Sequence, residues 1–135
     1  MRTALVAALG LVLAALPAPA QETEAGRDPA ALVLQQLAAL RAHDFAAAYA
    51  VASTELRRHY SRGEFEWMVK RAHPEVASSA YAFVVRTHEA SGFLYVTVKL
   101  QGRNGRSVEA LYELVREGEH WKVNALSSRR DDGLL

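Results

Sequence analysis

The apolar residues of this chain change their spacing once, near Ser79, and that change most constrains the fold. Before it, apolar residues recur every three or four positions, as on one face of a helix. After it, they alternate with polar residues, as in strands that bury one face. Helical and extended segments are therefore separated along the chain. This order predicts an α+β fold in which N-terminal helices cover one face of an antiparallel sheet.

Three helices are expected before Ser79, and each has its own capping residue. These caps are Asp28, Asp44 and Ser61. The S-x-x-E spacing from Ser61 to Glu64 is typical of a capping box. A proline after His73 should end the third helix, because the residue before proline is pushed out of the helical region. Residues 54–60 are read as a short turn between the second and third helices.

Four strands are expected after Ser79, with turns at Asn104-Gly105 and Glu117-Gly118. The more apolar face of each strand should meet the helices. That rule assigns the following residues to the inner face: Tyr81, Phe83, Val85, Thr87, Leu94, Val96, Val98, Leu100, Val108, Ala110, Tyr112, Leu114, Trp121, Val123 and Ala125.

The first twenty residues have the pattern of a secretory signal peptide. Arg2 precedes an apolar run from Ala4 to Leu16, and a Pro-Ala-Pro-Ala stretch follows. A membrane-spanning helix needs about 20 apolar residues, and this run is shorter. We expect cleavage after Ala20 and export to the periplasm or the medium, with no membrane span after removal of the signal.

Composition argues against several classes of function. The chain has 16 Lys and Arg, 15 Asp and Glu, and no cysteine. Charges of the two signs are mixed along it, whereas nucleic-acid binders usually carry a clustered basic excess. We therefore expect no nucleic-acid partner. Without cysteine there is no thiol nucleophile and no disulfide, so the fold must depend on its apolar core.

The stretch ALRAHDFAAAYAVAS, at residues 39–53, resembles the nuclear transport factor 2-like (cystatin-like cone) superfamily. Together with FEWMVKRAHPEV and VEALYELVREGEHWKVNAL, it is similar to a secreted bacterial family catalogued as a domain of unknown function, DUF4864. The resemblance implies three helices on the concave face of a four-stranded sheet. One departure is His43, where related sequences often carry Gly, Asn or another small polar residue.

This resemblance gives the expected organisation of the chain. We expect a signal peptide at 1–20, a flexible lead-in at 21–27, one cone-like domain at 28–128 and a polar tail at 129–135. Members of the superfamily include isomerases, dehydratases and binding proteins, usually with a pocket between helices and sheet. Isomerase or dehydratase chemistry needs a titratable group in that pocket, and the predicted inner strand face holds no Asp, Glu or His.

A non-catalytic binding or interaction module is therefore the favoured interpretation, and a pocket enzyme of isomerase or dehydratase type is the alternative. The five histidines lack the spacing of a zinc site, so neither a metal nor a cofactor is expected. Five residues are candidates to line a small apolar pocket, or else to fill the core. They are Tyr49, His73, Tyr81, Tyr112 and Trp121.

The outer sheet face carries large apolar residues among polar ones. Those assigned to it are Val84, Phe93, Tyr95, Leu111 and Leu126. A sheet face that exposes several large side chains often has a partner. We expect either a homodimer formed through this face or a few surface hydrophobic residues without a partner.

Overall fold

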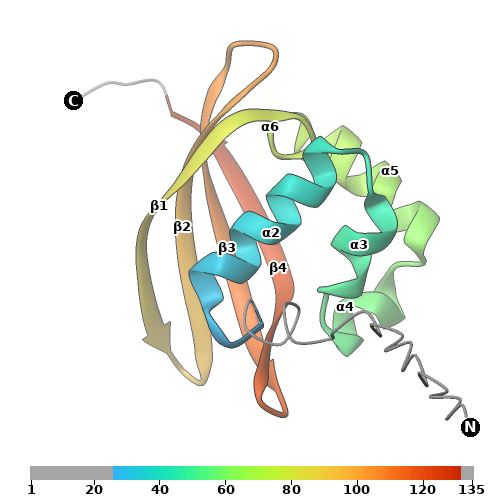
Figure 1. Cartoon of the computed structure of the whole chain (residues 1–135), viewed down its shortest axis with the longest axis vertical. Helices are drawn as coiled ribbons and strands as arrows, with labels where there is room; N and C mark the ends of the chain where they lie inside the picture. Colours follow the sequence, from blue (N-terminus) through green and yellow to red (C-terminus); the bar gives the residue numbers. More distant parts are fainter. Residues whose placement is uncertain (1–25, 132–135) are drawn as a thin grey trace, which may run out of the picture.

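The computed structural model describes residues 26–131, in which helices α2 to α6 precede strands β1 to β4 (Figure 1). The predicted signal peptide, residues 1–20, lies outside the described residues. The helices are α2 (Pro29–Arg41), α3 (Phe45–Ala50), α4 (Thr54–His59), α5 (Arg62–Ala72) and α6 (Pro74–Ala77). The strands are β1 (Ser79–Ala90), β2 (Phe93–Gly102), β3 (Ser107–Glu117) and β4 (His120–Arg130). The predicted α+β fold is confirmed.

The predicted caps start three of the helices. Asp28 accepts hydrogen bonds from Ala30 N and Ala31 N at the start of α2, and Asp44 Oδ1 accepts one from Ala47 N, 3.0 Å away, in α3. Ser61 and Glu64 form both bonds of the capping box that begins α5. The segment read as a turn after Ser53 is instead helix α4, because the Ser53 hydroxyl caps it. Pro74 ends α5 and starts the short helix α6.

The joint between α2 and α3 explains the unusual position of His43. His43 has a φ of 58°, in the left-handed region. The amide of Asp44 donates to Ala39 O, and that of His43 donates to Leu40 O. This pair of bonds is a Schellman motif, whose left-handed position favours Gly or Asn because neither is much hindered there. Residues 43 and 44 therefore end one helix and begin the next.

The sheet has the order β1-β2-β3-β4, and all of its neighbouring strands are antiparallel. The inner faces of the two central strands were predicted correctly. All eight of their assigned residues are buried: Leu94, Val96, Val98, Leu100, Val108, Ala110, Tyr112 and Leu114. Residues of helices α2 to α6 complete the core against this face, where the helices lie (Figure 1).

Strand β1 reverses part of the predicted face assignment. Its register with β2 pairs Ala82 with Leu100 and Val84 with Val98, so Ala82 and Val84 face the core. Tyr81 and Phe83 lie on the outer face, where they are 57% and 55% exposed. A register shift between Val84 and Arg86 makes Val85 the extra residue of a bulge.

Strand β4 shows the same effect at the other edge of the sheet. A register shift after Val123 leaves Asn124 as the extra residue, so that Ala125 pairs with Glu113 and Leu126 with Tyr112. Val123 is on the inner face as predicted, but Ala125 shares the outer face with Glu113, and Leu126 turns inward. The strand also includes Arg129 and Arg130, the first two residues of the predicted polar tail.

Candidate functional site

A cavity of about 420 Å³ lies between helices α2, α4 and α5 and strand β4. Most of its wall is apolar, and buried residues of all four elements form its deep part. Its lining residues are Gln36, Leu40, Glu55, Leu56, His59, Tyr60, Phe65, Met68, Val69, Ala72, His73, Val123, Asn124, Ala125 and Leu126. Among these, Glu55, His59, Tyr60, Ala72 and Ala125 are solvent-exposed, so they mark the mouth.

The cavity exists because helix α4 is fixed against β4 by polar contacts. Ser53 N donates to Val123 O at 2.7 Å, and Val123 N donates to Val51 O at 2.9 Å. The Ser53 hydroxyl donates to Asn124 Oδ1, 2.7 Å away, while it accepts from Leu56 N.

A carboxylate from the end of β3 holds the first residue of α4. Glu117 accepts bonds from Thr54 N at 2.7 Å and from the Thr54 hydroxyl at 3.0 Å. An anion at the N-terminus of a helix is favourable, because the free amides and the helix dipole are positive there. The loop before α4 and the start of α4 are thus tied to the β3–β4 hairpin, and α4 forms one wall of the cavity.

The innermost titratable group of the wall is His73, at the junction of α5 and α6. Its Nδ1 lies 2.6 Å from the Ser128 hydroxyl on β4. Burial lowers the pKa of His73 below its ordinary value of 6.5, although the nearby Glu75 carboxylate acts in the opposite direction. At neutral pH the imidazole is therefore uncharged, with one ring nitrogen bonded to Ser128.

Gln36 is a second polar group of the wall, and it is only 3% exposed. Its Nε2 donates to Ala48 O, 3.0 Å away, which ties α2 to α3. A backbone carbonyl can only accept, so this bond fixes the orientation of the amide. Within residues 26–131, the Oε1 atom of Gln36 accepts no hydrogen bond.

Of the five pocket candidates, only His73 lines this cavity. Tyr49 does not line the cavity but contacts two residues that do. Its ring centroid lies 5.5 Å from that of Phe65, and its hydroxyl donates to Tyr60 O at 2.6 Å. Tyr112 is fully buried in the core, and its hydroxyl has no hydrogen-bond partner among the described residues.

The other two candidates lie elsewhere. Tyr81 is on the outer sheet face, because the inner-face assignment of β1 was reversed there. Trp121 borders a smaller cavity of about 120 Å³ beside α2 and α3, and its ring stacks with Arg116. The prediction missed the residues of α4 because that segment was read as a turn. The cap Ser53 was the signal that could have revealed the helix.

The outer-face candidates are also divided. Leu111 is 38% exposed, and Phe93 and Tyr95 are partly buried on the outer side of β2. Val84 faces the core and Leu126 lines the cavity, since the two edge-strand registers differ from the predicted ones. Tyr81 and Phe83 take their place as the large exposed side chains of this face.

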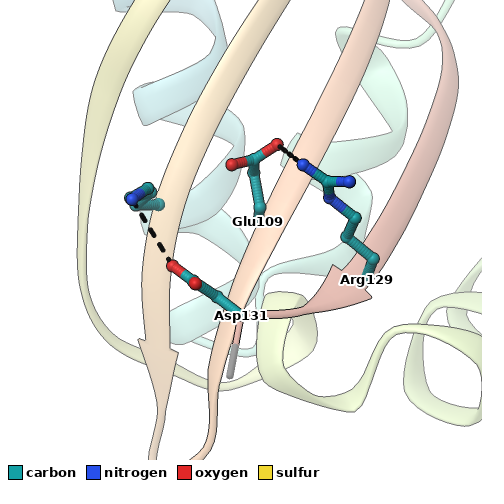
Figure 2. A network of polar contacts seen from close by, with 4 residues as sticks. Glu109, Arg129 and Asp131 are labelled. Atoms are coloured by element: carbon teal, nitrogen blue, oxygen red, sulfur yellow. Dashed lines mark hydrogen bonds and ion pairs between the residues drawn. The ribbon is translucent and has the colours of Figure 1, made fainter. Parts of the chain in front are cut away.

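The same face has a hollow of about 410 Å³, lined by residues of all four strands. Two ion pairs bridge neighbouring segments there, as Figure 2 shows. Arg129 Nη2 lies 2.9 Å from Glu109 Oε1, and Lys99 Nζ lies 3.6 Å from Asp131 Oδ2. The first pair joins β4 to β3 in the lining of the hollow, and the second joins Asp131 to β2 on the same face. Arg86 also lines the hollow and forms no ion pair with the described residues.

Two negative findings concern the described residues only. In the stretch 26–131, no helix is long and apolar enough to cross a membrane. The same stretch contains no group of three or more His, Cys, Asp or Glu side chains placed to hold a metal ion.

Comparison with known families matches residues 22–134 to the model of the domain of unknown function DUF4864. The match covers most of the chain, and the protein belongs to this family. The predicted family is thereby confirmed, while the wider resemblance to the nuclear transport factor 2-like superfamily stays a prediction. No curated protein and no solved structure matches the chain.

Proposed function

We propose that this member of the DUF4864 family is an exported binding module that holds a small, mainly apolar ligand in the cavity beneath α5. The observation that carries the proposal is the cavity itself, with its volume of about 420 Å³ and its largely apolar wall. Sites for small ligands are usually clefts of about 300–1,000 Å³ with apolar walls and a few polar groups. Gln36, His73 and Asn124 are the polar groups here.

Export is supported by the signal-like pattern of residues 1–20. The full chain, expressed in a Gram-negative bacterium, should appear in the periplasmic or medium fraction with Gln21 as its first residue. Fractionation and N-terminal sequencing test this. Recovery of the intact chain in the cytoplasm would overturn it.

Ligand binding can be tested with N-phenyl-1-naphthylamine, an uncharged apolar dye that fluoresces when it leaves water. The dye should bind the mature protein saturably. Ala72→Trp places a large ring at the mouth and should weaken binding at least about tenfold, because the cavity volume is lost. Ala46→Trp is a matched control, since Ala46 is also an exposed helical alanine but lies on α3 and does not line the cavity.

The proposal fails if the dye does not bind, or if both tryptophan variants bind it as the wild type does. Circular dichroism of the two variants should show the same helical content, so that lost binding is not confused with lost structure. Intrinsic tryptophan fluorescence is a poor substitute, because neither Trp67 nor Trp121 lines this cavity.

An enzyme of isomerase or dehydratase type is the second candidate, and one observation favours it. His73 places an imidazole, uncharged at neutral pH, in the cavity wall. Such a group can accept a proton from a bound substrate. Mass spectrometry of a ligand recovered after prolonged incubation separates the candidates. A ligand that the wild type leaves unchanged supports the binding module. A ligand that the wild type converts, but that His73→Gln leaves unchanged, supports the enzyme.

We also propose that the outer sheet face joins two copies of the chain. The exposed side chains of Tyr81, Phe83 and Leu111 support this, because large apolar groups that share a face usually have a partner. Light scattering should give a dimer that Phe83→Lys dissociates. Trp67→Lys is the control, since Trp67 is 63% exposed on helix α5. A monomer at high micromolar concentration would contradict the proposal.

A further inference from the structure

The charges around the cavity limit the ligands that it can hold. In the part of the chain that the structure describes, no Lys or Arg lines the cavity, and the one carboxylate of the lining, Glu55, is exposed at the mouth. The rest of the wall is formed by apolar side chains, together with the amides of Gln36 and Asn124 and the imidazole of His73, which is uncharged at neutral pH. A charged group that leaves water for such a site loses its hydration and gains no ion pair. The buried end of the ligand should therefore be uncharged.

The amide of Gln36 specifies which polar group fits. One N–H of its Nε2 is bonded to Ala48 O, and the carbonyl oxygen Oε1 accepts no hydrogen bond from the described residues. Gln36 is 97% buried as a residue, but its Oε1 atom is still accessible from the cavity. A ligand that displaces water from this oxygen without supplying a donor leaves the acceptor unpaired, which is costly. A ligand that brings an O–H or N–H group to this point removes the cost. A ligand that brings only acceptor atoms, such as an ether or a carboxylate, does not.

We infer that the cavity selects uncharged amphiphiles that have an apolar body and a hydrogen-bond donor, a hydroxyl or amide N–H, which bonds to Gln36 Oε1. This inference rests on the proposed binding function and adds the chemical class of the ligand. A ten-carbon chain is a suitable size, because its volume is smaller than the cavity volume of about 420 Å³.

Three decyl-sized compounds test the inference on the wild-type protein by displacement of N-phenyl-1-naphthylamine at pH 7.5. 1-Decanol carries a hydroxyl donor, nonyl methyl ether is its isomer without a donor, and decanoate carries a charge. The alcohol should displace the dye at a concentration about five- to tenfold lower than the ether, which is the effect of one hydrogen bond to an otherwise unpaired acceptor. Its advantage over decanoate should be at least about tenfold.

A pair of variants locates the donor contact. Gln36→Met keeps the length of the side chain but removes its carbonyl oxygen, so the alcohol should lose its advantage over the ether. Gln35→Met is the matched control on the same helix, because Gln35 borders the smaller cavity and not this one. It should keep the advantage unchanged.

The outcomes separate the inference from the proposed function. Equal displacement by alcohol and ether, stronger displacement by decanoate, or an advantage that survives Gln36→Met would each overturn the inference while the binding function stands. Absence of dye binding would overturn the binding function itself. The comparison of the three compounds needs only the wild type, so it remains decisive even if Gln36→Met does not fold.

Discussion

Replacement of Tyr112 by phenylalanine should stabilise this protein. Tyr112 is completely buried on β3, and its hydroxyl has no hydrogen-bond partner within residues 26–131. A buried hydroxyl without a partner costs about 1–3 kcal/mol. Its removal leaves a void of about 10 Å³, which costs only about 0.2 kcal/mol at about 24 cal/mol per Å³. We therefore expect the free energy of unfolding to rise by about 1–2 kcal/mol in Tyr112→Phe.

The same substitution should change the response to alkaline pH. Burial raises the pKa of Tyr112 well above its ordinary value of about 10. Above pH 10 the unfolded chain loses this proton while the folded protein keeps it, so the wild type loses stability as pH rises. Tyr112→Phe has no such proton, and its advantage should grow by about 1.4 kcal/mol per pH unit above pH 10.

Urea unfolding followed by circular dichroism at pH 7.5 and pH 11 measures both effects. Tyr81→Phe is the control at pH 7.5, because that ring is 57% exposed and its hydroxyl is not buried. It should change the free energy of unfolding by less than about 0.5 kcal/mol. The reasoning is refuted if Tyr112→Phe is destabilising at pH 7.5, since the hydroxyl would then have a partner that stabilises it.

Four further substitutions test other parts of the structure by urea unfolding. Asp44→Ala removes the cap of α3 and should lower the free energy of unfolding by about 1 kcal/mol without change in dye binding. His43→Gly should raise the free energy of unfolding by about 0.5–1 kcal/mol, because glycine is not strained at this left-handed φ. A stabilising Asp44→Ala or a destabilising His43→Gly would contradict the respective prediction. Gly102→Ala should cost about 1–3 kcal/mol, because the new Cβ would lie 3.1 Å from the Glu75 Cα, a backbone atom that cannot easily move; a neutral effect would show that the backbone adapts. The free energy of unfolding should fall less between pH 7 and pH 5 in His73→Gln than in the wild type. The reason is that the pKa of His73 is lowered in the fold, so the unfolded chain takes up the proton first as the pH falls. An equal fall in both proteins would exclude His73 as the source of this pH dependence.

The sequence predicted the helix starts and the two central strands well, because each depends on local or strictly periodic signals. Asp28, Asp44 and Ser61 cap helices through atoms only two or three residues away. Strands β2 and β3 pair with each other without a register shift, so alternate residues stay on one face from end to end.

The edge strands were predicted less well for a physical reason. Register shifts occur at Val85 in β1 and at Asn124 in β4, and a further one lies between Ser79 and Tyr81. One extra residue reverses the alternation between the residues before it and those after it, so one unbroken alternation cannot describe either strand. Alternation alone cannot reveal this, because Tyr81 and Phe83 are as apolar as the core residues that they were taken for. The bulge at Asn124 also brings Leu126 into the cavity wall.

Whether the cavity holds a titratable group could not be inferred from the strands alone. The predicted inner strand face holds no Asp, Glu or His, but the cavity has three further walls. Glu55 and His59 reach it from α4, and His73 reaches it from the junction of α5 and α6. These groups differ in a way that bears on function. Glu55 and His59 are exposed at the mouth, while His73 is partly buried and bonded to Ser128. A proton acceptor in this cavity would therefore have to be His73, and the effect of His73→Gln on ligand turnover, compared with its effect on dye binding, decides between an enzyme and a binding module.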